Sequence, residues 1–345
     1  MRVLVVGDSY ITTEVFEGGL MRLSGAHELS YVQLDEGERL SASRPPERTI
    51  REYIGTPEQV REHLDGAEIL LIHGAPVTDA VLDGSDVLRL VGCARGGPVN
   101  VDVEAASARS IPIVNTPGKN AAAVAELTLG LMIMLARRLP EGQRAAAQGR
   151  FGSTFEGAEF AGVELGGRSL GVIGYGQVGR QVVPRALACG MEVLVHDPFV
   201  EIGTCSGVEQ IAELQELVPR SDFVSLHARA SPDNEALFGP AEFAAMRPGS
   251  LFVNMARETL VDEEALERAL RDGPVGGAAL DVVHARPGRE PHPLLSHGNV
   301  VITPHVGGAT AETLARGVAM LADEVERFAA GLPLRNVINL KAISS

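Results

Sequence analysis

Short apolar runs alternate with amphipathic stretches along most of this chain. Apolar runs of this kind are typical of strands buried on both faces, and the stretches between them place apolar residues at helical spacing. This alternation predicts an α/β fold with parallel sheets and helices on both faces. The expected strands are residues 3–6, 27–34, 68–72, 88–93, 111–114, 170–173, 193–195, 223–226, 251–254, 277–282 and 300–303.

Helices are expected between these strands. Thr56 followed by Pro57 is a typical helix start, with Thr as the cap and Pro in the first turn. The expected helices are residues 57–64, 103–109, 120–148, 208–217, 241–246, 263–270 and 311–330. Residues 36–55 are polar and predict a long loop or an insertion, and we expect residues 334–340 to return to the first domain.

The stretch 120–148 is predicted to be one long helix. Its interior, AVAELTLGLMIMLA, is apolar nearly all round, which is typical of a helix buried within a protein or at a subunit contact. Glu126 lies inside this stretch. Because an unpaired buried charge is costly, we expect Glu126 to be a buried, hydrogen-bonded carboxylate.

A glycine-rich turn follows the strand at 170–173. Gly174 permits the tight turn, Gly176 lets the backbone approach a pyrophosphate, and Gly179 allows the next helix to pack on the sheet. Asp197 ends the following strand, where a carboxylate accepts the ribose hydroxyls and repels a 2′-phosphate. An ordinary βα turn would use similar glycines, but the added acid favours a site for NAD. Pro184 falls inside the expected helix and should kink or shorten it.

Composition narrows the classes of function. A length of 345 residues suggests two domains, and a net charge of -15 without a dense basic block argues against nucleic acid and anionic membranes as partners. Cys93, Cys189 and Cys205 lack the spacing of a disulfide framework or zinc site. With no signal peptide and no apolar stretch long enough to span a bilayer, we expect a soluble cytoplasmic protein.

Three polar residues follow strands in the second half of the chain: Arg257, Asp281 and His305. Ligands of open α/β sheets bind outside the carboxyl ends of the strands, so these side chains can converge near the nicotinamide end of the cofactor. A guanidinium can hold a carboxylate with two hydrogen bonds, and a histidine can move the proton of an alcohol or ketone. Each residue taken alone also fits a structural role.

Taken together, several motifs resemble the NAD-dependent D-isomer-specific 2-hydroxyacid dehydrogenases, a group that includes phosphoglycerate, glycerate, D-lactate and formate dehydrogenases. The matching stretches are VGCARGGPVNVD (91–102), NTPGKNAAAVAELTLGLMIMLAR (115–137), GYGQVG with HDP, LFVNMAR (251–257), GGAALDV (276–282) and NVVITPHVGG (299–308). The order of these motifs along nearly the whole chain makes the resemblance specific.

The resemblance implies a Rossmann NAD domain, residues 119–308, inserted into a flavodoxin-like substrate domain formed by 1–118 and 309–345. It implies that Arg257 binds the substrate carboxylate and 2-oxygen and that His305 is the general acid and base. It also implies a homodimer supported by the helix from Asn120. Because the chain ends at Ser345, we expect no C-terminal regulatory domain of the kind that some phosphoglycerate dehydrogenases carry. The other residues it assigns are Gly96 and Gly97 (carboxylate), Asn120 (site lining), Asp281 (nicotinamide side), and Gln177, Val178, Ala228, Met255 and Ala256 (NAD groove).

The family normally has a glutamate immediately before one particular proline, and this chain departs from that pattern. Arg286 stands at that position, and Glu290 lies four residues further on. A cation beside His305 would disfavour its imidazolium form, which hinders ketone reduction more than alcohol oxidation. Glu290 could instead fold back as a substitute partner.

Three further departures add charge. Glu258 follows Arg257 where a glycine is usual, Arg229 stands where the family has proline, and Arg95 lies in the substrate loop. Arg229 and Arg286 could form salt bridges with Glu258 and Glu290. In a second interpretation, Arg95, Lys119, Arg229 or Arg286 recognises a second anionic group of the substrate, because guanidinium geometry suits phosphate and carboxylate.

These observations lead to one expected function and two rivals. We expect an NAD-dependent oxidoreductase that acts on a small D-2-hydroxy acid, with a phosphorylated or dianionic acid such as phosphoglycerate as one candidate, and with loops 73–79 and 93–100 setting the substrate. The first rival is an NAD(H)-sensing scaffold with little turnover, suggested by Arg286. The second is an altered dehydrogenase of the formate type, which the arginine and the shorter N-terminal region disfavour.

Overall fold

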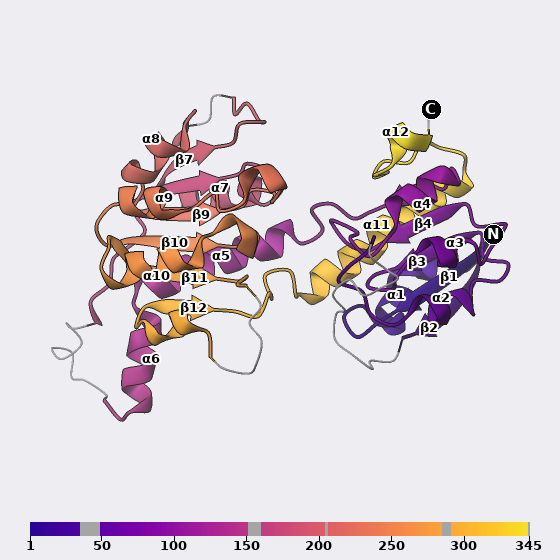
Figure 1. Cartoon of the computed structure of the whole chain (residues 1–345), viewed down its shortest axis with the longest axis horizontal. Helices are drawn as coiled ribbons and strands as arrows, with labels where there is room; N and C mark the ends of the chain where they lie inside the picture. The colour runs from indigo at the N-terminus through magenta and orange to yellow at the C-terminus, as the bar shows by residue number, and fades with distance from the viewer. Residues whose placement is uncertain (35–48, 151–159, 204–205, 285–290, 344–345) are drawn as a thin grey trace. The chain divides into compact units, whose positions relative to one another are not determined.

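The computed structural model describes residues 1–34, 49–150, 160–203, 206–284 and 291–343. The chain divides into two compact units: Met1–Lys119 with Thr310–Ser345, and Asn120–Ala309. The second unit is therefore inserted into the first, and each contains a parallel sheet between helices (Figure 1).

The first unit contains a five-stranded parallel sheet in the order β2-β1-β3-β4-β5, the flavodoxin-like order. Its strands are β1 (Arg2–Gly7), β2 (Glu28–Gln33), β3 (Ile69–Ile72), β4 (Leu90–Cys93) and β5 (Ile113–Val114). Its helices are α1 (Thr13–Leu20), α2 (Pro57–Arg61), α3 (Asp79–Leu82), α4 (Val103–Ala108), α11 (Ala311–Ala329), α12 (Leu340–Ile343) and the 3₁₀ turn η1 (Met21–Leu23).

Alternating side chains of these strands enter two separate cores. Leu4, Leu70 and Val91 pack with residues of α2, α3 and α4 on one face of the sheet. Val5 and Leu71 pack with residues of α1 and α11 on the other face. The strands read as continuous apolar runs in the sequence because both of their faces are covered.

The second unit contains a seven-stranded parallel sheet in the order β12-β11-β10-β9-β6-β7-β8, the doubly wound Rossmann order with one added strand. Its strands are β6 (Ser169–Ile173), β7 (Glu192–His196), β8 (Val208–Gln210), β9 (Phe223–Leu226), β10 (Ser250–Asn254), β11 (Val275–Leu280) and β12 (Val300–Ile302). The predicted fold class is confirmed.

Helices cover both faces of this sheet as well. They are α5 (Ala121–Ala136), α6 (Leu139–Ala147), α7 (Gly179–Ala188), α8 (Leu214–Leu217), α9 (Pro240–Ala245) and α10 (Glu263–Arg271). Short 3₁₀ turns are η3 (Val218–Arg220), η4 (Pro232–Asn234), η5 (Glu258–Leu260) and η6 (Pro293–Ser296). Residues of α5 and α7 share one core, and residues of α8, α9 and α10 share the other.

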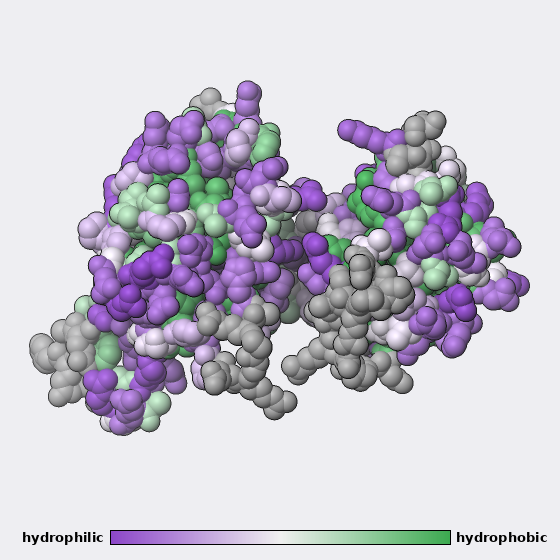
Figure 2. Space-filling view, in the orientation of Figure 1, coloured by the Kyte–Doolittle hydropathy of each residue, from purple (hydrophilic) through white to green (hydrophobic). Residues whose placement is uncertain are grey.

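The surface contrasts with these cores. Hydrophilic side chains predominate on the face shown in Figure 2. Within the described residues, no helix combines the length and the apolar character needed to cross a membrane.

The prediction of one helix over residues 120–148 is wrong, because the chain breaks between α5 and α6. Arg138 adopts left-handed backbone with φ 51°, and α6 starts again at Leu139. Pro140 has no N–H to donate to the Ala136 carbonyl four residues earlier, so the helix cannot continue through it. The Val163 N–H donates to that carbonyl instead, at 2.8 Å.

Glu126 is not the buried carboxylate that we expected. Its side chain is 68% exposed and pairs with Arg185 of α7 at 3.4 Å. The residue lies on the side of α5 turned away from the core, whereas Ala125 and Thr128 on the same helix are buried. The nearly uniform apolar composition of α5 gave no periodic signal to show this.

One further local prediction was wrong. The expected helix 208–217 is instead strand β8, which pairs in parallel with β7, followed by the single turn α8. Pro184 does not end α7, which continues to Ala188.

The expected return of the chain end is confirmed, because Ile338 donates its N–H to the Ile113 carbonyl at 3.0 Å beside β5. Most of the expected loop 36–55 lies outside the described residues.

Candidate functional site

Most candidate residues of the second unit lie just beyond the carboxyl ends of its strands. The glycine turn follows β6, Asp197 follows β7, and Ala228 follows β9. Arg257 follows β10, Asp281 follows β11, and His305 follows β12. All strand pairs of this sheet are parallel, so these residues line one edge. Neighbouring strands lie about 4.8 Å apart, which separates β10 from β12 by roughly 10 Å.

The glycine turn is shaped for close approach. Gly174 has φ +96°, and a Cβ there would meet the Ala228 nitrogen at 2.6 Å. A Cβ at Gly179 would meet the Gly174 carbonyl oxygen at 2.2 Å, whereas one at Gly176 would meet nothing within 4 Å. The turn therefore packs tightly against the segment that follows β9 and against the start of α7, but leaves the backbone at Gly176 open. Helix α7 begins at Gly179, where unpaired N–H groups favour an anion.

Asp197 ties the second strand to this turn. One of its carboxylate oxygens accepts the Tyr175 N–H at 2.7 Å, and the other accepts the Phe199 N–H at 2.9 Å. Each oxygen can accept a further hydrogen bond, so two hydroxyl groups of a ribose can still be bound. Open backbone at Gly176, a helix start and a carboxylate with spare acceptor capacity fit a dinucleotide.

Arg257 is exposed at the end of β10. The buried Asn254 side chain accepts the Ala256 N–H at 2.9 Å and donates to the Arg257 carbonyl at 2.9 Å. These two bonds fix the turn from which the guanidinium projects. Asn254 was missed by the sequence analysis, although a polar residue that ends a buried strand was a signal for it.

Asp281 holds the turn that carries His305. One carboxylate oxygen accepts the Thr303 hydroxyl at 2.6 Å and the Val306 N–H at 2.8 Å, and the other accepts the Gly307 N–H at 2.8 Å. The Asp281 carbonyl accepts the His305 N–H at 2.9 Å. His305 itself has left-handed backbone with φ 55° and an exposed side chain. A strained backbone held by four hydrogen bonds is the kind of feature found at functional sites.

The remaining candidates of this unit surround the same edge. Met255 and Ala256 are buried, with the Met255 Cε 3.0 Å from the position of a Cβ on Gly307. Gln177 is exposed and Val178 half-buried at the start of α7. The Asn120 amide nitrogen lies 2.9 Å from the position of a Cβ on Gly308, so Asn120 lies close to the turn of His305.

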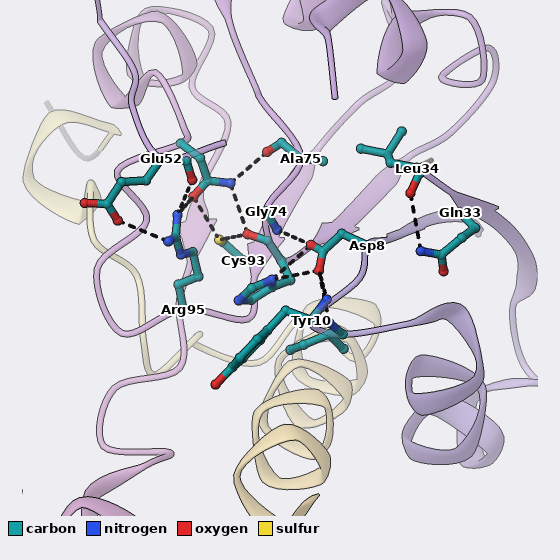
Figure 3. A network of polar contacts seen from close by, with 12 residues as sticks. Asp8, Tyr10, Gln33, Leu34, Glu52, Gly74, Ala75, Cys93 and Arg95 are labelled. Atoms are coloured by element: carbon teal, nitrogen blue, oxygen red, sulfur yellow. Dashed lines mark hydrogen bonds and ion pairs between the residues drawn. The ribbon is translucent and has the colours of Figure 1, made fainter. Parts of the chain in front are cut away.

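In the first unit, Gly96 and Gly97 are exposed after β4. The Gly96 carbonyl accepts the Asn115 amide at 2.8 Å. Arg95 is not left open for an anion, because its guanidinium donates to the Glu52 carbonyl at 2.9 Å and to the Asn100 side chain at 3.2 Å. Its second terminal nitrogen pairs with the Glu52 carboxylate at 3.2 Å (Figure 3).

The sequence analysis missed a buried acid and histidine in this unit. Asp8 follows β1 and His73 follows β3, and the Asp8 carboxylate lies 2.9 Å from the Nδ1 of His73. Asp8 also accepts the N–H groups of Gly74, Tyr10 and Ile11 (Figure 3). Their positions at two strand ends were a signal, because neighbouring parallel strands end at the same edge.

The other charged residues that depart from the family pattern fall into two groups: some lie outside the described residues, and others form no ion pair within them. Arg286 and Glu290 lie outside the described residues. Neither Arg229 nor Glu258 forms an ion pair with any residue that the structure describes. In the same part of the chain, no group of three His, Cys, Asp or Glu side chains could hold a metal ion.

The fold of the second unit and the residues at the carboxyl edge of its sheet define a dinucleotide-binding α/β protein. The profile of the family described as D-isomer specific 2-hydroxyacid dehydrogenase, NAD binding domain, matches residues 129–307. The D-3-phosphoglycerate dehydrogenase of Methanocaldococcus jannaschii is 37% identical over 292 residues, 84% of this chain and 55% of that protein. The chain belongs to the D-isomer specific 2-hydroxyacid dehydrogenase family, and it spans about half the length of the curated relatives it matches.

Solved structures agree on the fold. The TT0316 protein of Thermus thermophilus is 31% identical with a TM-score of 0.78, covering 98% of this chain and 100% of that one. The D-lactate dehydrogenase of Aquifex aeolicus, solved with NAD and lactic acid, is 24% identical with a TM-score of 0.71, covering 99% and 97%. The predicted family and the NAD-binding class of its inserted unit are confirmed.

Proposed function

We propose that this protein is an NAD-dependent oxidoreductase that interconverts a small D-2-hydroxy acid and its 2-keto acid. The observation that carries the proposal is the shared strand edge of the second unit. It places the glycine turn, Arg257 and the Asp281-held turn of His305 after parallel strands of one sheet. Family membership supports the same reaction class.

Each residue has one role in this proposal. Arg257 binds the substrate carboxylate and the 2-oxygen through its guanidinium, which can donate two parallel hydrogen bonds. His305 takes the proton of the 2-hydroxyl during oxidation and returns it during reduction. NAD, when bound, accepts or supplies the hydride. Gly96, Gly97 and Asn120 help to bind the substrate, and the first unit is the substrate domain.

The cofactor roles are proposed for residues around the glycine turn. The backbone from Gly174 to Gly179 and the start of α7 bind the pyrophosphate. Asp197 binds the adenosine ribose, and its charge selects NAD over NADP. The remaining residues that we propose to line the groove are Gln177, Val178, Ala228, Met255, Ala256 and Asp281.

A homodimer is part of the proposal. Ile133 on α5 and Leu139 on α6 are 39% and 48% exposed, although both are large apolar side chains. Exposed apolar residues of this kind on two consecutive helices favour a contact with a second copy. The mass of the protein in solution tests this directly.

The experiment that tests the reaction is absorbance at 340 nm with NAD and a panel of 2-hydroxy acids, phosphorylated ones included. Arg257→Ala should lower kcat/KM by about 10² to 10³ because it removes charge-assisted hydrogen bonds. His305→Ala should lower it by about 10² to 10⁴, the usual contribution of general acid–base catalysis. Arg268→Ala, on the exposed face of α10, and His63→Ala, exposed in the first unit, are matched controls.

The same experiment distinguishes the dehydrogenase from the NAD(H)-sensing scaffold. Turnover that requires both Arg257 and His305 supports the dehydrogenase. NADH binding without turnover on any acid of the panel would refute it in favour of a protein that senses the cofactor.

A further inference from the structure

A polar cluster lies at the carboxyl edge of the five-stranded sheet. Asp8 follows β1, His73 follows β3 and Arg95 follows β4, and these three strands are neighbours in the sheet. Lys119 is the last residue of the segment that leads from β5 out of this unit. It lies close enough to His73 for its charge to act on the imidazole: burial lowers the pKa of His73, and the charges of Lys119 and Arg95 lower it further. Figure 3 shows Asp8 and Arg95 in this cluster, with Gly74 and Cys93 between them.

The Asp8 carboxylate fixes the tautomer of His73. Asp8 is fully buried and accepts three backbone N–H groups, and its interaction with His73 helps to hold its pKa below the usual value. A carboxylate can only accept, so the Nδ1 of His73 carries the proton that is shared between them. Tyr10 stacks on the imidazole at 5.0 Å and limits its rotation. The Nε2 of His73 is therefore left as a hydrogen-bond acceptor.

Within the described part of the chain, Lys119 is a buried cation without a partner. Its residue is 7% exposed, and no described residue forms a hydrogen bond or ion pair with its Nζ. Gly317 of α11 leaves room for the side chain, since a Cβ there would meet the Lys119 Cδ at 2.9 Å and the Nζ at 3.4 Å. A buried ammonium without a counterion is costly and favours an anion.

The neighbouring groups offset this charge only in part, because the negative charge of Asp8 favours the ammonium but no described acceptor forms a hydrogen bond with it. Arg95 is occupied by Glu52 and Asn100, and Asp8 by His73 and backbone N–H groups. Burial raises the pKa of the Cys93 thiol to about 12, so this group is neutral. Arg316 of α11 donates to the Lys119 carbonyl and adds positive charge. Lys119 Nζ and His73 Nε2 have no further hydrogen-bond partner among the described residues, yet neither atom is fully enclosed. Both therefore remain accessible to a ligand.

We propose that Lys119 Nζ and His73 Nε2 form a phosphate-binding site on the first unit. The phosphate would be that of the substrate, and this assignment rests on the proposed function. One phosphate oxygen accepts from the ammonium, and a single proton shared between another oxygen and Nε2 completes the second hydrogen bond. Burial lowers the pKa of His73 below that of a free imidazole, so Nε2 acts as an acceptor and the proton of this second hydrogen bond is carried by the phosphate.

The test uses the fact that the chain has two lysines, Lys119 and Lys341, of which Lys341 is exposed and serves as an internal control. Desolvation by burial lowers the pKa of Lys119 to about 8. Amine labelling of the intact protein followed by mass spectrometry should therefore show Lys119 reacting as the pH rises through about 8. Lys341 is exposed and reports how a solvent-accessible amine reacts under the same conditions.

Inorganic phosphate is the probe, with potassium chloride at matched ionic strength as its control. Phosphate should slow the labelling of Lys119 by about tenfold, the usual effect of a charge-assisted hydrogen bond, and leave Lys341 unchanged. His73→Asn keeps a donor toward Asp8 but removes Nε2, so it should weaken the protection. Labelling of Lys119 that phosphate does not slow, or slows equally for Lys341, would overturn the site, as would full protection in His73→Asn.

This labelling needs no turnover, so its outcome is independent of the proposed reaction. Where phosphate protects Lys119 but no acid is oxidised, the site stands and the proposed function fails. Where turnover is found, Lys119→Met should raise the KM of a phosphorylated 2-hydroxy acid about tenfold more than that of its unphosphorylated analogue. Equal effects on the two KM values would refute the assignment.

Discussion

The Asp281 carboxylate provides the sharpest test of how this protein positions His305. It is 3% exposed and accepts hydrogen bonds from Thr303, Val306 and Gly307 at 2.6 to 2.8 Å. Asp281→Asn keeps the shape of the side chain and replaces one oxygen by an NH₂ group. Either orientation of the amide then sets this NH₂ against a backbone N–H, that of Gly307 or that of Val306.

The size of the effect follows from this mismatch. A hydrogen bond to a charged group contributes about 1.5–3 kcal/mol, and a buried donor left without a partner costs about 1–3 kcal/mol. Asp281→Asn should therefore lower the free energy of unfolding by roughly 2 kcal/mol. The turn holds His305 in left-handed backbone, so the same loss displaces the imidazole. Since about 1.4 kcal/mol is a factor of ten in rate, kcat should fall about 10- to 100-fold.

The assay combines steady-state kinetics, NADH titration by fluorescence and urea unfolding. Asp262→Asn is the matched control, because Asp262 accepts one N–H, that of Ala265, at the start of α10. Asparagine caps a helix about as well as aspartate does, so this control should leave both the free energy of unfolding and kcat nearly unchanged. Thr303→Val removes one donor and retains the charge, so its effect on kcat should be smaller than that of Asp281→Asn.

The result that would refute this reasoning is a normal kcat in Asp281→Asn with a weakened affinity for NADH. Asp281 would then act through the nicotinamide side of the cofactor instead of through the turn of His305. A loss of stability equal to that of Asp262→Asn, with kcat unchanged, would also refute the positioning role.

Two further predictions concern the cofactor and acid stability. Asp197→Ser should weaken NADH binding and strengthen NADPH binding, each by about tenfold, because it removes an acceptor and a repulsive charge; an unchanged preference in fluorescence titrations would contradict the role of Asp197. Burial lowers the pKa of His227 to about 3, so the unfolded chain takes up the proton first, near 6.5. The free energy of unfolding should therefore fall as the pH drops from about 6.5 toward 3, by up to ~1.4 kcal/mol per pH unit for this group. His227→Gln should flatten that slope in urea titrations at pH 7 and 5, and an unaltered slope would show that other groups cause it.

Local patterns in the sequence determined much of this protein. The apolar runs predicted the strands because a strand buried on both faces needs continuous apolar residues. The glycine turn and Asp197 could be recognised because a tight turn and a close backbone approach demand particular residues within a short segment. The capping box of Thr56 and Gln59 at the start of α2 is local in the same sense.

Features that depend on distant partners required the tertiary structure. The break at Arg138 depends on Val163 as well as on Pro140, β8 is a strand because it pairs with β7, and Glu126 is exposed because of the side on which α5 packs. Asp8 and His73 lie 65 residues apart and meet because β1 and β3 are neighbours in the sheet. Periodicity reports which face of an element is apolar, but not what that face meets. The sequence alone therefore determined most of the elements and the family. The tertiary structure decided which polar groups come together, and that the charge of Lys119 finds no partner among the described residues.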